Sequence, residues 1–249
     1  MGNRPRMTAA ATALVTVAVQ ALAAAALTAC GGSAARSQPG SPQPGSSQSA
    51  SARPATAAIA GMKTAIRAAT SVHLTGSLSE TGGKTVGLNV GLTRSGLFSG
   101  TVAEGGTTLT IINAGGRVYI KATRAFLAQL GVPAAVCSLM CGKYVAMSSA
   151  RGDALAGQLS MTQLLQEISG RLPAFTSAGI RIINGQLAQV LHGADGSTLA
   201  VAATGRPYPV EAISPHDSRG SISFSRWNSV PAPVTPPARQ VIDLSKLGG

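Results

Sequence analysis

The sequence predicts an α+β fold, a curved antiparallel β half-barrel of about nine to ten strands with helices covering its concave face. Short segments that alternate apolar and polar residues fill much of the chain between Ser71 and Asn228, and Gly-Gly, Asn-Gly and Asp-Gly turns separate them. Helical patterns precede these segments and interrupt them once. A sheet with this many strands has to curl, and the curl produces a concave face.

Residues 1–29 have the pattern of a lipoprotein signal peptide. Two arginines form a basic start, residues 8–26 carry no charge, and Leu-Thr-Ala-Cys follows at 27–30. This is the layout of a secretory signal that ends in a bacterial lipobox, so we expect Cys30 to carry the lipid and to become the N-terminus after cleavage. The alternative is an uncleaved transmembrane helix, for which the Ala-rich run is only weakly apolar.

Residues 30–54 are expected to be the lipidated cysteine and a flexible linker. The stretch is rich in Gly, Ser, Pro and Gln and has no apolar period. Residues 55–249 are expected to form one domain, since this length is enough for a full hydrophobic core. The expected location is the outer face of the cytoplasmic membrane, with the lipid as anchor.

The first element of the domain is a predicted helix over residues 55–70. Ile59, Met62, Ile66 and Ala69 recur at spacings of three and four, which gives one apolar stripe. A helix on the membrane surface is the alternative. The stripe is narrow and short, which favours packing on a sheet.

From Ser71 the period changes to two. The clearest alternation lies at 84–94, and further strands are predicted at 97–103, 107–113 and 117–121. Glycine pairs at 82–83, 105–106 and 115–116 supply the positive φ angles that tight hairpins need. Five strands joined in this way form an antiparallel meander.

Helical patterns return at 123–130 and at 153–169, where Asp153 is the expected N-cap. Cys137 and Cys141 lie between them. Because the lipid takes Cys30, these two form an even pair in an exported protein, which favours a structural disulfide. The alternatives are a metal site, although no His or acidic residue is adjacent, and a redox motif, whose spacing would be C-x-x-C.

Strand patterns resume after the second helix and continue to about residue 228. Asn184-Gly185 and Asp195-Gly196 mark two hairpin turns, and Ile222 and Phe224 alternate with serine in the last strand. The tail, 231–249, is Pro-rich and then weakly apolar. We expect it to dock on the domain.

Composition favours some partners over others. The formal net charge is +12, which attracts the chain to an anionic membrane surface, although an arginine bias in an Ala- and Gly-rich chain explains it equally well. The Lys and Arg residues are scattered, and one Trp, three Tyr and four Phe are few for stacking on bases. Nucleic acid is therefore not a predicted partner.

No catalytic residue, metal site or cofactor is predicted, and the protein is not expected to be an enzyme. The chain has eight acidic residues and three histidines, and it contains no H-E-x-x-H, G-x-S-x-G, P-loop or dinucleotide motif. His73 falls in an opening strand and His192 near a hairpin. His216 and Asp217 lie in a polar loop, and a hydrolase that uses His216 is the alternative from the enzyme class.

Several local motifs resemble a known family. They are the lipobox at Cys30, the strand SVHLTG at 71–76, the hairpin INAGGRVYIK at 112–121, GKYV at 142–145 and TGRPYP at 204–209. Over residues 55–245 the chain resembles the LolA-like half-barrel lipoproteins, in particular the actinobacterial LppX/LprG-type family. The resemblance implies an apolar cavity between the sheet and its helices that holds the acyl chains of lipids, glycolipids or lipoproteins. One departure is the cysteine pair beside the covering helices, which would stiffen a lid.

The function that this resemblance implies is lipid or glycolipid binding, and in a carrier also transfer, by a membrane-anchored lipoprotein outside the cytoplasm. An envelope transporter is then a candidate partner. The predicted cavity lining is one aliphatic face of the early strands: Leu88, Val90, Leu92, Leu109, Ile111, Val118 and Ile120. The same face serves equally well as a filled core, so the alternative function is a cell-envelope adaptor that binds a protein partner.

Overall fold

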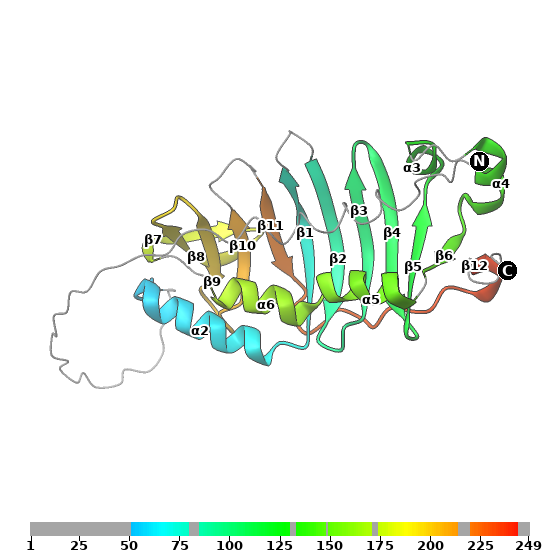
Figure 1. Ribbon diagram of the computed structural model, residues 1–249. Helices are drawn as coiled ribbons and strands as arrows, with labels where there is room; N and C mark the ends of the chain where they lie inside the picture. The colour runs from blue at the N-terminus through cyan, green and yellow to red at the C-terminus, as the bar shows by residue number, and fades with distance from the viewer. Residues whose placement is uncertain are drawn as a thin grey trace, which may run out of the picture.

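One open sheet of twelve strands dominates the computed structural model (Figure 1). The structure describes residues 51–79, 85–129, 133–147, 149–170, 174–213 and 220–243, so Cys30, the predicted signal peptide and most of the linker lie outside it. The strand order is β12-β6-β5-β4-β3-β2-β1-β11-β10-β9-β8-β7. The sheet is thus two meanders that meet where β1 pairs with β11.

The two meanders contain all but one of the strands. The first consists of β1 (Ser71–Ser79), β2 (Thr85–Thr93), β3 (Phe98–Glu104), β4 (Thr107–Ala114), β5 (Arg117–Ala122) and β6 (Tyr144–Ala146). The second consists of β7 (Phe175–Ile183), β8 (Gln186–Gly193), β9 (Thr198–Ala202), β10 (Pro209–Ile213) and β11 (Ser221–Ser225). All these neighbours pair antiparallel.

The predicted hairpin turns are present where the structure describes them. Both glycines at 105–106 and at 115–116 have positive φ, as do Asn184, Gly185 and Gly196. These are the left-handed conformations that tight hairpin turns require. The glycine pair at 82–83 lies outside the described residues.

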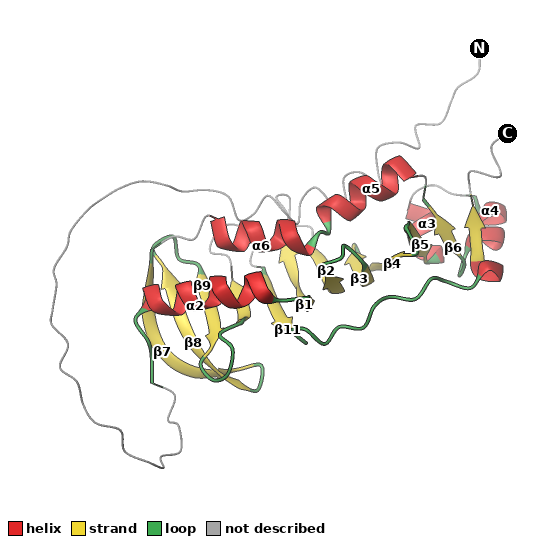
Figure 2. Ribbon diagram, turned by 90° about the horizontal axis from the view of Figure 1, so that it is seen from below, coloured by secondary structure: helices red, strands yellow, loops and turns green. Residues whose placement is uncertain are grey.

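Helices α2 (Ala55–Ala68), α5 (Ser149–Gln158) and α6 (Met161–Gly170) cover one face of the sheet (Figures 1 and 2). Met62 and Ile66 of α2 are fully buried together with Val72 and Phe98 of the sheet in the main core. The predicted apolar stripe of α2 therefore packs on the sheet. Among the described residues, no helix is long and apolar enough to span a bilayer.

Arg94, in the turn after β2, holds the C-terminus of α2. Its Nε donates to the carbonyl oxygen of Ala69 at 2.7 Å and its Nη2 to that of Arg67 at 2.6 Å. A cation bound to the last carbonyls also interacts favourably with the helix dipole. This contact fixes where α2 ends above the sheet.

The chain after β11 forms a strap, residues 226–240, that runs to the far edge of the sheet (Figure 1). At its start the ring of Trp227 stacks on that of Tyr208 with centroids 4.6 Å apart, and the Asn228 N–H donates to the Ser71 carbonyl oxygen at 2.9 Å. The strap ends in a 3₁₀ turn (Ala238–Gln240), and β12 (Val241–Asp243), which follows it, pairs parallel with β6. The tail therefore docks on the domain, as predicted, up to residue 243.

Asp243 of β12 also contacts β5. Its Oδ2 accepts a 2.8 Å hydrogen bond from Nη1 of Arg117, and this bond with the accompanying charge attraction raises the pKa of Arg117. The pair adds a side-chain link to the three-residue strand.

The end of the β7–β8 hairpin bends away from the helices. The register shifts between Ser177 and Ile180, and Gly179 has a φ of 91°. Beyond this bulge, Nδ2 of Asn184, in the turn between β7 and β8, donates to Oγ of Ser223 on β11 at 3.1 Å, although β9 and β10 lie between β8 and β11 in the sheet. The hairpin end therefore packs on the outer face, where Ala188, Ala200 and Val210 form a small second cluster with Ile183 and Ala202.

Three predictions about elements need correction. The sheet has twelve strands instead of about nine to ten, because the three-residue strands β6 and β12 are too short to show alternation. The single helix expected at 153–169 is two helices, and Asp153 lies inside α5 instead of capping it. The break falls after Gly157, a poor helix former, at Ser160, whose Oγ lies 3.5 Å from the Gln163 nitrogen. The segment between the two predicted helices, for which no helix was predicted, contains helix α4 (Ala134–Met140).

Candidate functional site

The seven predicted lining residues all lie on the concave face. In the ladders, Val90 is opposite Gly100, Gly100 is opposite Ile111, and Ile111 is opposite Ile120. Because side chains alternate across a strand, residues opposite one another share a face. The remaining four, at even spacings on the same strands, share it as well: Leu88, Leu92, Leu109 and Val118.

The part of this face beneath the helices is filled by side chains. Val90, Leu92, Ile111 and Val118 belong to the main core with the buried residues of α2. Helix α5 approaches closely here, since a Cβ built on Gly152 would lie 3.5 Å from Cβ of Val118. These four residues therefore contact protein.

The next row along the same face is less covered. Ile222, Gly76, Leu88 and Val102 follow one another across β11, β1, β2 and β3, and each is half-buried. We call these four residues the half-exposed row. Figure 1 shows α2, α5 and α6 crossing the lower ends of the strands, while the upper ends of β1–β4 extend beyond the helices. The row lies in that upper part and continues on β4 into Leu109.

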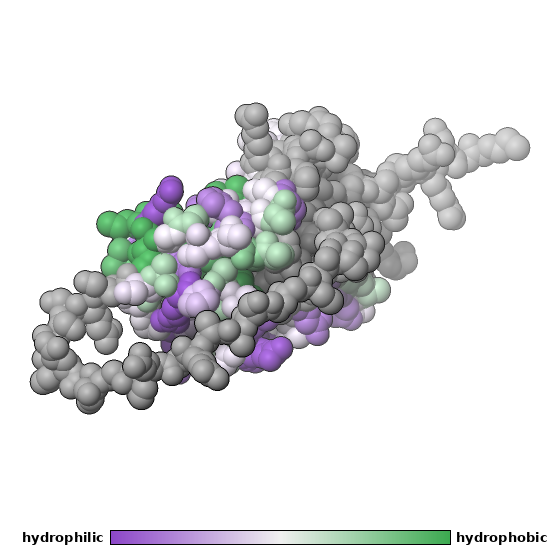
Figure 3. Space-filling view, turned by 90° about the vertical axis from the view of Figure 1, so that its left-hand side faces the viewer, coloured by the Kyte–Doolittle hydropathy of each residue, from purple (hydrophilic) through white to green (hydrophobic). Residues whose placement is uncertain are grey.

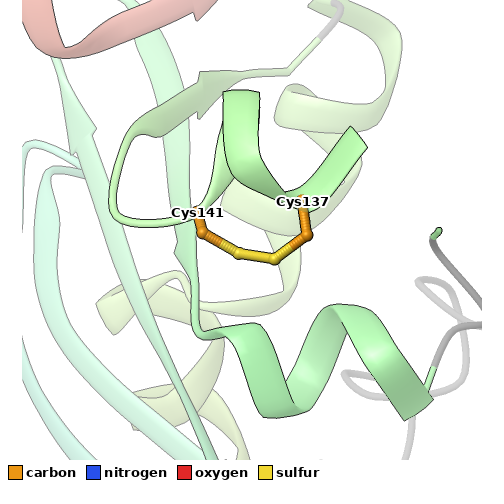
Figure 4. The surroundings of a disulfide bond; sticks show 2 residues. All are labelled: Cys137 and Cys141. Atoms are coloured by element: carbon orange, nitrogen blue, oxygen red, sulfur yellow. A yellow bond between two sulfur atoms is a disulfide. The ribbon is translucent and has the colours of Figure 1, made fainter. Parts of the chain in front are cut away.

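Leu109 is covered by a separate pair of short helices, α3 (Arg124–Gln129) and α4. Its side chain forms a small cluster with Leu127 and Cys137, against which the half-buried Ile120 also packs. The predicted disulfide between Cys137 and Cys141 is present, with Cα atoms 5.1 Å apart, and it spans one turn at the end of α4 (Figure 4). The disulfide thus stiffens the cover over one end of the apolar row.

Two glycines make the curvature of this face possible. A Cβ built on Gly100 would lie 2.1 Å from the backbone oxygen of Asn89, and one on Gly76 equally close to that of Ser221. Real Cβ atoms do not approach backbone so closely, so neighbouring strands can fold in at these points only because no side chain is present. Gly76 belongs to the half-exposed row, and Gly100 lies opposite Val90 on the same face.

The outer face of the central strands is polar. His73 is placed between Asn89 and Ser225, with Nε2 2.8 Å from Oδ1 of Asn89 and Nδ1 3.3 Å from Oγ of Ser225. The combination has the composition of a hydrolytic triad, but Asn89 and Ser225 are exposed on an open sheet surface. A nucleophile needs a substrate held against it in a defined site, so we assign the three residues to surface hydrogen bonding.

Of the other two histidines, the structure describes one. His192 contacts Oγ1 of Thr198 at 3.2 Å on the exposed face of β8, and His216 with Asp217 lies outside the described residues. Within the described part of the chain, no three His, Cys, Asp or Glu side chains are grouped as a metal site would need.

Sequence reasoning missed three members of the half-exposed row: Gly76, Val102 and Ile222. A signal existed for Val102, because Phe98, Gly100 and Val102 alternate with polar residues and the hairpin after Leu92 puts them on the same face. For Ile222 the alternation with serine gave the strand but not its neighbour in the sheet. Ile222 reaches the row only through the pairing of β11 with β1, which joins residues more than 140 positions apart, as in Gly76 with Ile222.

No family model matches the sequence, and no curated protein matches it. Among solved structures it is similar to the lipoprotein LppX of Mycobacterium tuberculosis, at 16% identity over 72% of this chain and 96% of that chain, with a TM-score of 0.46. It is also similar to LprF from Mycobacterium bovis, at 15% identity over 75% and 99% of the two chains, with a TM-score of 0.49.

A third similar structure is the MucA/MucB complex of Pseudomonas aeruginosa, at 12% identity, 74% of this chain, 59% of that chain and a TM-score of 0.31. The chain thus spans about three-fifths of the length of the chain that it matches in this complex. The similar structures include an LppX-type lipoprotein, the kind of protein that the sequence motifs resemble.

Proposed function

We propose that this protein is a membrane-anchored lipoprotein that binds lipids or glycolipids by their acyl chains. The observation that carries the proposal is the half-exposed row on the concave face. It offers apolar surface that is only half-buried, and two of its members, Val102 and Ile222, also pack against the main core. Lipid binding requires such surface and no reactive groups.

The dimensions of the row suit an acyl chain. From Ile222 to Leu109 it crosses four strand spacings, about 19 Å along the sheet. An acyl chain of a membrane lipid has a comparable extended length. Each methylene that leaves water for this row contributes about 0.8 kcal/mol, so the affinity grows with the length of chain buried.

The covers determine how the ligand enters. Helices α5 and α6 lie along one side of the row, and the disulfide-linked pair α3–α4 covers its end at Leu109. A ligand that enters from the upper side, where Val86 is buried but the row itself is half-buried, needs no opening of the main core. In the same proposal, transfer to an envelope transporter would use this side.

The anchor in the proposal is the lipid on Cys30, followed by the linker at 30–54 and the domain at 55–249. On random-coil scaling the linker would reach about 25–30 Å. This keeps the domain within reach of the membrane that supplies its ligand. Two or three acyl chains on one cysteine give stable anchoring.

One observation favours the second candidate function, an adaptor that binds a protein partner. The part of the concave face under the helices is filled, with Met62, Val72 and Phe98 completely buried. A filled half-barrel has no interior for a ligand and would act through its surface. The two functions differ in whether lipid is bound at the half-exposed row.

The test replaces apolar residues of the row with a charge. We expect the wild-type protein to retain lipid that mass spectrometry finds in its organic extract, and the Leu88→Asp and Val102→Asp variants to lose most of it. The matched control is Thr101→Asp, which places the same charge on the neighbouring outward position of β3. Thermal unfolding of each variant checks the fold. Wild-type protein that is consistently empty would favour the adaptor, and equal lipid in all variants would remove the row as the site.

A further inference from the structure

The end of the β7–β8 hairpin carries an exposed pair of large apolar side chains. Ile182 is 72% exposed and Leu187 is 41% exposed, and the two are partners in the ladder. Figure 3, which faces this end of the molecule, shows hydrophobic side chains gathered at its edge. We call residues 181–187 the hairpin tip. Grouped apolar side chains at a protein surface are typical of a contact site.

The hairpin tip is a fixed structure. Its inner side packs on the outer face of the sheet through Ile183, and Asn184 bonds to Ser223 of β11. Ile182 and Leu187 lie on the opposite side of the hairpin from Ile183, on the face that carries Gln189 and Leu191 farther along β8, and they extend beyond the buried part of that face. The apolar pair is therefore presented to the outside by a supported turn.

The linker enters the domain beside this tip. The buried side chain of Gln189, two residues after Leu187, accepts a hydrogen bond from the Arg53 N–H at 3.1 Å and donates to the Arg53 carbonyl oxygen. Arg53 lies two residues before the start of α2, on the side of the chain that leads back to Cys30. The tip thus lies at the end of the molecule to which the anchor is attached.

The charge around the tip is positive on balance, although Glu211, the ladder partner of Ser223, lies near it. Arg181 lies next to Ile182, and the loop at 203–208, which holds Arg206, adjoins the tip through the Ala203 N–H and the Leu187 carbonyl oxygen, 2.9 Å apart. Arg53, Arg181 and Arg206 are all exposed. Apolar side chains flanked by arginines suit an anionic bilayer, where the apolar groups enter the headgroup boundary and the cations pair with phosphates.

We infer that the hairpin tip inserts Ile182 and Leu187 into the surface of the anionic membrane that carries the lipid anchor. This contact rests on the proposed anchoring of the chain through Cys30. It orients the domain with β7 toward the bilayer and β12 away from it, and it brings the β11 end of the half-exposed row closer to the membrane than the Leu109 end.

The test is a fluorescent label on the full lipidated chain in vesicles of phosphatidylcholine and phosphatidylglycerol in equal parts. Because Cys30 is acylated and the other two cysteines form a disulfide, Ile182→Cys introduces one free thiol for an environment-sensitive dye. We expect a blue shift and quenching by nitroxide-labelled lipids. The matched control is Val234→Cys on the strap, an apolar position that is 82% exposed and far from the linker, where we expect neither effect.

Charge variants test the arginines. In the labelled protein, Arg181→Gln should lower the equilibrium constant for membrane contact about fivefold, because one cation near an anionic surface contributes about that factor. Vesicles without phosphatidylglycerol, or high salt, should also lower the equilibrium constant for membrane contact.

The outcomes separate this inference from the proposed function. Equal signals at positions 182 and 234 would overturn the membrane contact, whether or not lipid is extracted from the same preparation. A shift at 182 that needs no vesicles and follows protein concentration would also overturn it, since β7 is an edge strand that a second copy could contact. If position 182 is quenched in protein that never retains ligand, the membrane contact of the hairpin tip is supported and the proposal of lipid binding is contradicted.

Discussion

Gly100 lies where the backbone of β2 comes too close for any side chain. The expected effect of Gly100→Ala is a loss of about 1–3 kcal/mol in the free energy of unfolding, because the added methyl group forces the strands apart. Gly87→Ala is the control. A Cβ there makes an ordinary contact of 3.5 Å with Cβ of Ala103, so we expect little change or a slight gain. Urea unfolding of the two variants measures the difference, and equal stabilities would contradict the role given to Gly100.

At the residue scale, the sequence predicted which side chains share a face but not which of them are covered. Leu88 and Leu92 lie on the same strand and the same face, yet Leu88 is half-buried and Leu92 is buried. The alternation of apolar and polar residues predicts on which side of the sheet a side chain lies, because that side follows from local backbone geometry. Coverage depends on the path of α2, α5 and α6 over the sheet, and no local pattern encodes that path.

At the scale of elements, the disulfide is expected to stabilise the cover formed by α3 and α4. Joining residues four apart restricts the unfolded chain and contributes about 2 kcal/mol on the loop-entropy model. We therefore expect the double variant Cys137→Ala, Cys141→Ala to speed hydrogen exchange in α3 and α4 and to leave the central strands β1 and β2 protected. Exchange followed by mass spectrometry measures both regions.

The same variant tests how the cover relates to the ligand. If α3–α4 closes one end of the apolar row, bound lipid should exchange faster with vesicles when the disulfide is absent. Exchange at the wild-type rate, with α3 and α4 demonstrably loosened, would show that the ligand does not pass this end.

Elements were predictable where the local signal was long. The predicted helix at 55–70 is α2, and the strands predicted at 84–94 and 107–113 are β2 and β4 with ends shifted by one residue. Helix α4 was missed because seven residues show too little periodicity to distinguish a helix from a loop. Strand β12 exists only through pairing with β6, which is a tertiary contact.

At the scale of the whole molecule, anchoring is expected to depend on one atom, the sulfur of Cys30. Cys30→Ala should move the protein from the membrane fraction to the soluble fraction, because the remaining contacts are weak without acyl chains. The double variant of Cys137 and Cys141 is the control and should stay with the membrane. Retention of Cys30→Ala protein would mean that the N-terminal segment is an uncleaved anchor.

The pairing of β1 with β11 has a consequence for assembly of the chain. Strands β1 to β6 pair with their neighbours in sequence, so a chain that emerges N-terminus first can complete this half of the sheet early. The other edge of β1 stays open until β11 appears, since His73 and Ser225 are 152 residues apart. An open edge strand is prone to pair with the wrong chain, and pairing over such a distance is slow. The order of emergence therefore leaves β1 as the strand most in need of protection before folding is complete.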